Sequence, residues 1–147
     1  MTVDTDKIRT KLQFVREAVR RLTEIRSRGR EAFLTDPILQ GAAERNLQIG
    51  IEAMLDTANH IIAREGLTVP GSYREAMETL VREKILPASQ RENFLRMASF
   101  RNRIVHLYDQ IDPVEVYGIL EGHLGDFESF LGAIGRRYFT SDEREVP

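Results

Sequence analysis

Apolar residues recur at steps of three and four through most of the chain, and strand-like alternation does not occur. The first segment, from near Asp6 to the residues around Gly29, shows this most clearly. Its apolar positions form one stripe, and arginine and glutamate occupy the opposite side. The members of the stripe are Ile8, Leu12, Val15, Val19, Leu22 and Ile25. This pattern predicts a helix that buries one face.

The second predicted helix has residues at both ends that favour starting and stopping a helix. Asp36 can cap its first turn, and Pro37 suits the first helical position because the missing amide proton has no partner there. Gly66 favours its end. Between these residues the apolar positions cover more than one face. We therefore expect this helix either to be central in a bundle or to be shared between a core and a subunit interface.

Three further helices are predicted by similar signals. Ser72–Glu75 and Ser89–Glu92 resemble capping boxes, which would open a third helix ending near Lys84 and a fourth helix. Asp112 followed by Pro113 would open a fifth helix that extends to about residue 138. The pattern predicts an all-α antiparallel bundle of about five helices. It would form a single domain over residues 1–139, followed by a frayed tail over residues 140–147.

Composition narrows the class of protein. The 147 residues are 41% hydrophobic and 30% charged, which is typical of a globular domain. There is no cysteine, and therefore neither a disulfide nor a thiolate metal site. No apolar run is long enough for a membrane span, and the N-terminus lacks the apolar core of a signal peptide, so we expect a cytoplasmic protein that makes no membrane contact. The net charge of −2 argues against a protein that coats DNA.

Arginine supplies 18 of the 21 basic residues. Arginine suits phosphate contacts, but it is also common in GC-rich genomes, and we favour this second cause. The densest group lies in the first predicted helix and just after it. Its members are Arg16, Arg20, Arg21, Arg26, Arg28 and Arg30. They are interpreted as the solvated side of an amphipathic helix, with an RNA-guiding rim as the alternative.

The segment Arg101-Asn102-Arg103-Ile104-Val105-His106-Leu107-Tyr108 is the strongest candidate for chemistry. It brings a guanidinium, an imidazole and a phenol to the end of a predicted helix. An imidazole transfers protons near neutral pH, and a guanidinium binds phosphate and stabilises negative charge. On an ideal helix Asn102 and His106 share a face, whereas Arg101 and His106 diverge by about 140°. The polar residues after Tyr108 predict that the helix stops just beyond it, which would loosen this geometry.

RNA cleavage without a metal needs a base, an acid and a cation near the phosphate oxygens. One chain offers a single motif histidine. A two-fold homodimer would place two copies of Arg101 and His106 across one cleft and would supply both proton-transfer roles.

The residues of this segment could instead have purely structural roles. His106 could be a helix cap, Arg101 could pair with an acid such as Asp109 or Glu92, and Tyr108 could be a core aromatic. His60 and His123 have no neighbouring pattern of ligands, so we expect no metal site.

The segment RNRIVHLY also resembles the Arg-X4-His-X-Tyr signature of the HepT-type toxins, which belong to the HEPN ribonuclease superfamily. DPILQGAAERNLQIGIEAMLDTANHII and PGSYREAMETL upstream, and YDQIDPVEVYGILEGHLGDF downstream, are similar to the family as well. The resemblance implies a HEPN-like helical fold and a metal-independent endoribonuclease that needs no cofactor.

The resemblance further implies a role and a partner. The protein would be the toxin of a type VII-like toxin–antitoxin system, and its partner would be a minimal nucleotidyltransferase, the MntA-type antitoxin. Arg101 and His106 would be catalytic, and Asn102 would orient His106. Tyr108 would accept AMP from the antitoxin, and this modification would silence the nuclease.

Two alternatives remain beside the toxin. The first is a binding module that accompanies a minimal nucleotidyltransferase and binds a nucleotide or substrate without cleaving it. The second is a dimeric bundle that has lost its activity.

Overall fold

The computed structural model describes residues 3–106 and 111–139, and in these ranges all regular structure is helical. The elements are α1 (Thr5–Ser27), α2 (Arg30–Thr35), α3 (Pro37–Arg64), α4 (Tyr73–Arg82), a 3-10 turn η1 (Ala88–Gln90), α5 (Arg91–Val105), α6 (Pro113–Gly122) and α7 (Leu124–Tyr138). The predicted all-α bundle is confirmed. Among the described residues, no helix has both the length and the apolar content that crossing a membrane requires.

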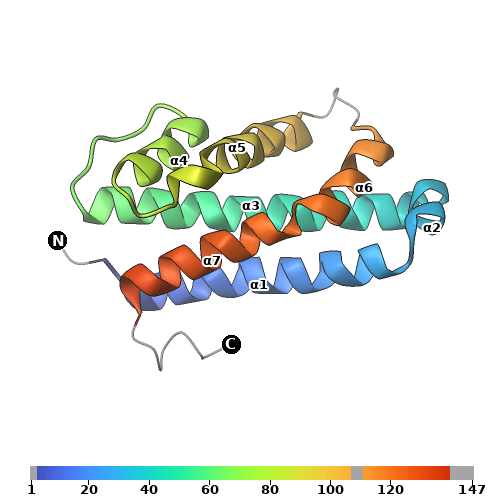
Figure 1. The fold of residues 1–147 in the computed structure, drawn as a ribbon, viewed down its shortest axis with the longest axis horizontal. Helices are drawn as coiled ribbons and strands as arrows, with labels where there is room; N and C mark the ends of the chain where they lie inside the picture. Colours follow the sequence, from blue (N-terminus) through green and yellow to red (C-terminus); the bar gives the residue numbers. More distant parts are fainter. Residues whose placement is uncertain (1–2, 107–110, 140–147) are drawn as a thin grey trace.

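The two longest helices, α1 and α3, lie side by side along the molecule, and the shorter helices cover them (Figure 1). Besides α1, α3 packs against α2, α4, α5 and α6. A position in the middle of the bundle therefore explains why its apolar residues cover more than one face. At Gly50 of α3 an added Cβ would lie 2.9 Å from Cε1 of Phe127 and 3.2 Å from Cβ of Ala18. Glycine is required there because α1, α3 and α7 meet closely.

Most of the predicted helix boundaries are confirmed. Oδ1 of Asp36 accepts a hydrogen bond from the amide of Ile38 at 2.9 Å, and Asp112 caps α6 in the same way. Gly66 has a φ of 70° directly after α3. Ser72 caps α4 by accepting from the amide of Glu75 at 3.1 Å. These local signals therefore set where the long elements begin and end.

The predicted capping box at Ser89 is wrong. Ser89 lies inside the 3-10 turn η1, and α5 begins only at Arg91, with no side-chain cap from Gln90. Pro87 is extended immediately before this turn. Because the backbone already turns at Ser89, its hydroxyl does not stand in front of the helix, where a cap must stand.

The fifth predicted helix is two helices, α6 and α7, separated at His123. His123 has a φ of −128° and a ψ of 6°, which are not helical values, and Nδ1 of its ring lies 3.2 Å from Oδ2 of Asp126. Short α2 is a second difference. It lies between Gly29, whose φ is 95°, and Asp36, and it buries Phe33 completely.

Candidate functional site at the end of α5

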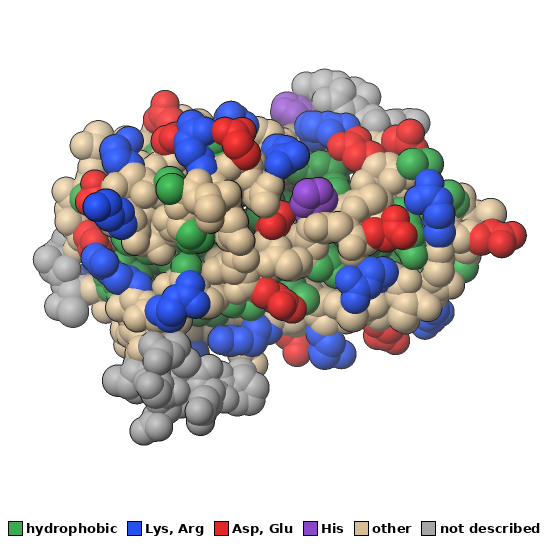
Figure 2. Space-filling view, viewed as in Figure 1, with side chains coloured by type: hydrophobic (Ala, Val, Ile, Leu, Met, Phe, Trp, Pro, Cys, Tyr) green, Lys and Arg blue, Asp and Glu red, His purple; other side chains and the backbone are tan. Residues whose placement is uncertain are grey.

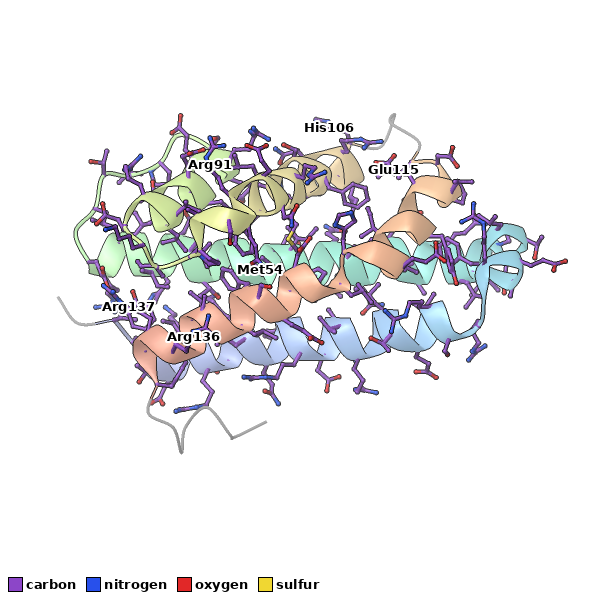
Figure 3. All side chains as sticks on the ribbon, viewed as in Figure 1. Met54, Arg91, His106, Glu115, Arg136 and Arg137 are labelled. Atoms are coloured by element: carbon purple, nitrogen blue, oxygen red, sulfur yellow. The ribbon has the colours of Figure 1, made fainter. Side chains whose placement is uncertain are left out.

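α5 ends at Val105, and His106 is the residue that follows its last turn. The His106 backbone is extended, with a φ of −86° and a ψ of 109°, and its amide donates to the carbonyl of Arg103 at 3.3 Å. The helix therefore ends earlier than the sequence predicts, and the angles of an ideal helix do not apply to His106. The residue is exposed at this end of the helix (Figure 3). Tyr108 and Asp109 lie outside the described residues.

Arg101 is held between three helices. Its Nε and Nη2 lie 3.1 Å and 3.0 Å from Oε2 of Glu52, which projects from α3. Its guanidinium carbon lies 4.8 Å from the ring centroid of Tyr73, the first residue of α4. Only 21% of the Arg101 side chain is exposed. Ion pairing on one edge and the aromatic face on one side fix the position of the cation.

Asn102 contacts the same guanidinium, because Nη1 of Arg101 donates to its Oδ1 at 3.3 Å. The sequence predicted an acid beside Arg101 as one alternative, and an acid is present. It is Glu52, however, whereas Glu92 pairs with Arg91. Glu52 gives no local sequence signal for this pairing because it lies 49 residues away in the chain.

α4 is fastened to α5, and this places Tyr73. Nη1 of Arg74 donates to Oγ of Ser99 at 2.7 Å, and Arg91 forms two hydrogen bonds, of 2.6 Å and 2.8 Å, with the carboxylate of Glu78. These hydrogen bonds and the charge of Arg91 lower the pKa of Glu78. The contacts keep α4 and α5 in register, so that the ring at the start of α4 meets Arg101.

Arg103 fastens the other side of the site. Its Nη1 and Nη2 lie 2.6 Å and 2.9 Å from the two carboxylate oxygens of Glu115 in α6. Figure 3 shows Glu115 near the start of α6, close to the end of α5 where His106 lies. This bidentate pair sets the distance between the two helix ends on either side of residues 107–110.

The remaining histidines take no part in this arrangement. Nε2 of His60 accepts a hydrogen bond from the amide of Asp4 at 3.2 Å. Burial, followed by the charges of Arg64 and Lys7, lowers the pKa of His60. His123 pairs with Asp126 at the break between α6 and α7. Within residues 3–106 and 111–139, no group of three His, Asp or Glu side chains is close enough to hold a metal ion.

Several arginines in and just after α1 pair with neighbouring acids, whereas Arg16 donates to the side chain of Gln13 and the half-buried Arg26 donates to the backbone carbonyl of Leu120. Arg20 and Arg21 both contact Glu17, at 2.8 Å and 3.5 Å, and Arg28 contacts Glu24 at 3.9 Å. This agrees with the interpretation of an amphipathic helix surface. The alternative, an RNA-guiding rim, stays a prediction.

The fold and this helix end define a helical bundle with an arginine and a histidine at the end of one of the helices that cover α1 and α3. The family model described as ribonuclease HepT-like matches residues 15–134. The chain is 30% identical to the mRNA nuclease HepT of Shewanella oneidensis over 129 residues, 88% of this chain and 96% of that protein. It is 27% identical to the tRNA nuclease HepT of Aphanizomenon flos-aquae over 138 residues, 92% of each.

Solved structures agree. The HEPN toxin of Shewanella oneidensis, in its tri-AMPylated form and in complex with the MNT antitoxin, superposes with a TM-score of 0.83 at 30% identity. The match covers 89% of this chain and 98% of that one. The protein belongs to the HepT-like ribonuclease family, as the sequence motif predicted.

Proposed function

We propose that this protein is the toxin of a toxin–antitoxin system and an endoribonuclease that cleaves RNA without a metal ion. The observation that carries the proposal is the end of α5, where Arg101 is fixed by Glu52 and Tyr73 and His106 is exposed to solvent. The relatives named as mRNA and tRNA nucleases support RNA as the substrate class.

In this reaction the imidazole of His106 takes the proton from the 2′-hydroxyl of the substrate. The 2′-oxygen then bonds to phosphorus as the bond to the 5′-oxygen breaks, and an acid gives that oxygen a proton. Arg101 stabilises the charge that develops on the non-bridging oxygens. A homodimer in which the two α5 ends face one cleft supplies the second His106 as the acid.

Asn102 and Glu52 are positioning residues in this proposal. The role of Asn102 in orienting His106 stays a prediction, and its side-chain oxygen also accepts from Arg101, so Asn102 supports the guanidinium as well. Glu52 holds Nε and Nη2 on one edge of Arg101. A phosphate therefore has to bind through the remaining N–H groups, and this limits its approach to one side.

The partner in this proposal is an MntA-type nucleotidyltransferase antitoxin. It would transfer AMP from ATP to Tyr108, two residues beyond His106. The added AMP group would occupy the space that RNA needs, and its negative charge would lie beside Arg101 and His106. The AMPylated Shewanella toxin in complex with its MNT antitoxin supports this regulation.

The experiment that tests this regulation uses the Tyr108→Phe variant. After incubation with the antitoxin and ATP, this variant should stay unmodified, as judged by intact mass, and should still cleave RNA. Tyr73→Phe is the matched control, and AMP on the Tyr108→Phe protein would identify another acceptor.

The experiment that tests the nuclease is cleavage of total RNA by the purified protein in EDTA. Wild type should cleave, His106→Ala should not, and the control His60→Ala, which lies away from the α5 end, should retain cleavage. Circular dichroism should show that all three fold. A His106→Ala protein as active as wild type would place the chemistry elsewhere.

A second function, a binding module without cleavage beside a nucleotidyltransferase, is favoured by one observation. Glu52 already neutralises Arg101, and most of the Arg101 side chain is covered. In this case folded wild type and His106→Ala would both bind RNA, and neither would cleave it. Intact mass would first exclude a protein purified with AMP already attached.

A further inference from the structure

A cavity lies on the side of α5 that faces α6 and α7, away from the contacts of Arg101 with α3 and α4. It has a volume of about 260 Å³ and opens where α5, α6 and α7 meet over α3. Figure 2 shows hydrophobic side chains in a hollow of this face, with charged and histidine side chains around it. Its apolar lining consists of Leu47, Ile51, Met97, Phe100, Ile119 and Phe127. The volume is below the roughly 300 Å³ at which pockets for drug-sized molecules begin, so it suits one flat ring system.

One wall of this cavity is a hydrogen-bonded polar group. Asp126 is only 8% exposed. Its Oδ1 accepts a hydrogen bond from Nδ2 of Asn93 at 3.1 Å, and its Oδ2 lies 3.2 Å from Nδ1 of His123. Because a carboxylate only accepts, Nδ1 of a neutral His123 carries the proton. Its Nε2 is then an acceptor, and 46% of the side chain is exposed. The wall therefore presents an oriented acceptor beside an apolar floor.

The mouth of the cavity carries a cation, Arg96, that is not neutralised by an acid among the described residues. Arg96 is exposed, and its Nη2 donates to Oδ1 of Asn93 at 2.7 Å. In the part of the chain that the structure describes, Arg96 forms no ion pair with an acid. Arg103 lies at the same mouth, with its guanidinium carbon 5.7 Å from the ring centroid of Phe100, but its Nη1 and Nη2 pair with Glu115. A phosphate is the natural partner of the Arg96 guanidinium.

We propose that this cavity binds one base of single-stranded RNA, with the attached phosphate at Arg96, and that it selects bases that carry an exocyclic amino group. The base contacts Phe100 and Met97, and the amino group donates to Nε2 of His123. The biological role of this inference rests on the proposed function. Arg103 and His106 follow the cavity residues along the same segment of the chain, so the bound base would lie near the proposed nuclease site. The cavity would determine which base lies beside the cut.

Binding of mononucleotides to the wild-type protein without antitoxin is the direct test. AMP should bind, as measured by titration of the protein in nuclear magnetic resonance experiments. UMP should bind several-fold more weakly. Ile119→Trp fills the cavity and should weaken AMP binding by about tenfold or more, given the usual contribution of base stacking. The matched control Val69→Trp adds the same ring at a site that is 83% exposed and should leave binding unchanged. Arg96→Gln should weaken AMP binding, whereas Arg45→Gln on the exposed side of α3 should not.

Cleavage of a randomised RNA in EDTA is the second measurement. Wild type should prefer amino-bearing bases at one position beside the cut, and Ile119→Trp should cleave less and lose the preference. AMP binding that Ile119→Trp blocks, in a protein that does not cleave RNA, would support the cavity and refute the proposed nuclease. RNA cleavage without AMP binding would refute the cavity alone. An Ile119→Trp protein that binds AMP normally but changes its oligomeric state would show that a second protein surface covers the cavity, and would overturn the proposal.

Discussion

Arg101 and Arg103 are two residues apart, and each contacts a carboxylate and an aromatic ring, but their surroundings differ. Arg101 directs two nitrogens at one oxygen of Glu52, and its side chain is 21% exposed. Arg103 uses both oxygens of Glu115, and its side chain is 46% exposed. The first pair is enclosed by α3 and α4, whereas the second joins two helix ends at the surface. A buried cation contributes to charge stabilisation far more than a solvated one, because water screens it less.

Replacing each arginine should separate these roles most clearly. Arg101→Ala should lower RNA cleavage in EDTA by about 100-fold or more, as does the loss of other groups that stabilise transition-state charge. Arg103→Ala should lower it by less than about tenfold, since the charge that it removes is more exposed. Single-turnover rates on one RNA, with thermal unfolding of each variant, would measure this. Equal losses in two folded proteins would remove the distinction.

Glu52 and Glu115 should contribute differently to the free energy of unfolding of the protein. Glu52→Gln leaves the cation of Arg101 without its counter-charge in a mostly covered position, and it should cost about 1–2 kcal/mol. Glu115→Gln should cost less than about 1 kcal/mol because its pair is solvated. Urea unfolding at one pH gives both values. A larger cost for Glu115→Gln would mean that joining α5 to α6 matters more than covering Arg101.

Replacing Tyr73, whose ring lies against the Arg101 guanidinium, should have a smaller effect on RNA cleavage. Tyr73→Leu removes the aromatic face and should lower cleavage by about two- to fivefold, the usual scale of an exposed cation–π contact. Tyr73→Phe keeps the face and should stay close to wild type. If both variants lost activity equally, the hydroxyl rather than the ring would be responsible.

Replacing His60, which is remote from both arginines along the chain, should have the smallest effect. It should change the stability of the fold, and only at low pH. The pKa of His60 is lowered in the folded state, chiefly by burial. The unfolded chain therefore binds more protons, and stability is complete above the ordinary pKa of histidine, about 6.5, and falls as the pH drops below it. His60→Gln should reduce this fall without removing the acceptor for the amide of Asp4. Urea midpoints at pH 7.5 and pH 5 would show it, and an unchanged pH dependence would exclude His60 as a cause.

The long helices could be predicted from the sequence because their signals are local. Asp36, Gly66 and Asp112 set helix ends through contacts within a few residues, and the apolar stripes follow the helical period. The motif itself was also visible as a spacing of residue types. It does not reveal Glu52 or Tyr73, because only the packing of α3 and α4 on α5 brings them to Arg101.

The break at His123 could not be predicted for a related reason. The apolar period continues through it and gives no sign of a break, and the pairing of His123 with Asp126 is seen only in the folded bundle. Without this break, a single continuous helix would follow Pro113, and the cavity wall formed by Asn93, His123 and Asp126 would not exist. The sequence therefore predicts the helices better than the hollows between them.

The ends of the described chain bear on how the protein can be handled. Asp4 donates through its amide to His60, and Tyr138 donates through its hydroxyl to Glu65 at 2.7 Å, so both ends are anchored near the close of α3. Figure 1 shows the start of α1 and the end of α7 at the same end of the bundle, away from the end of α5. A fluorescent label or a surface tether attached at either end would leave the α5 face open. Immobilised protein should therefore still be accessible to RNA and to an antitoxin.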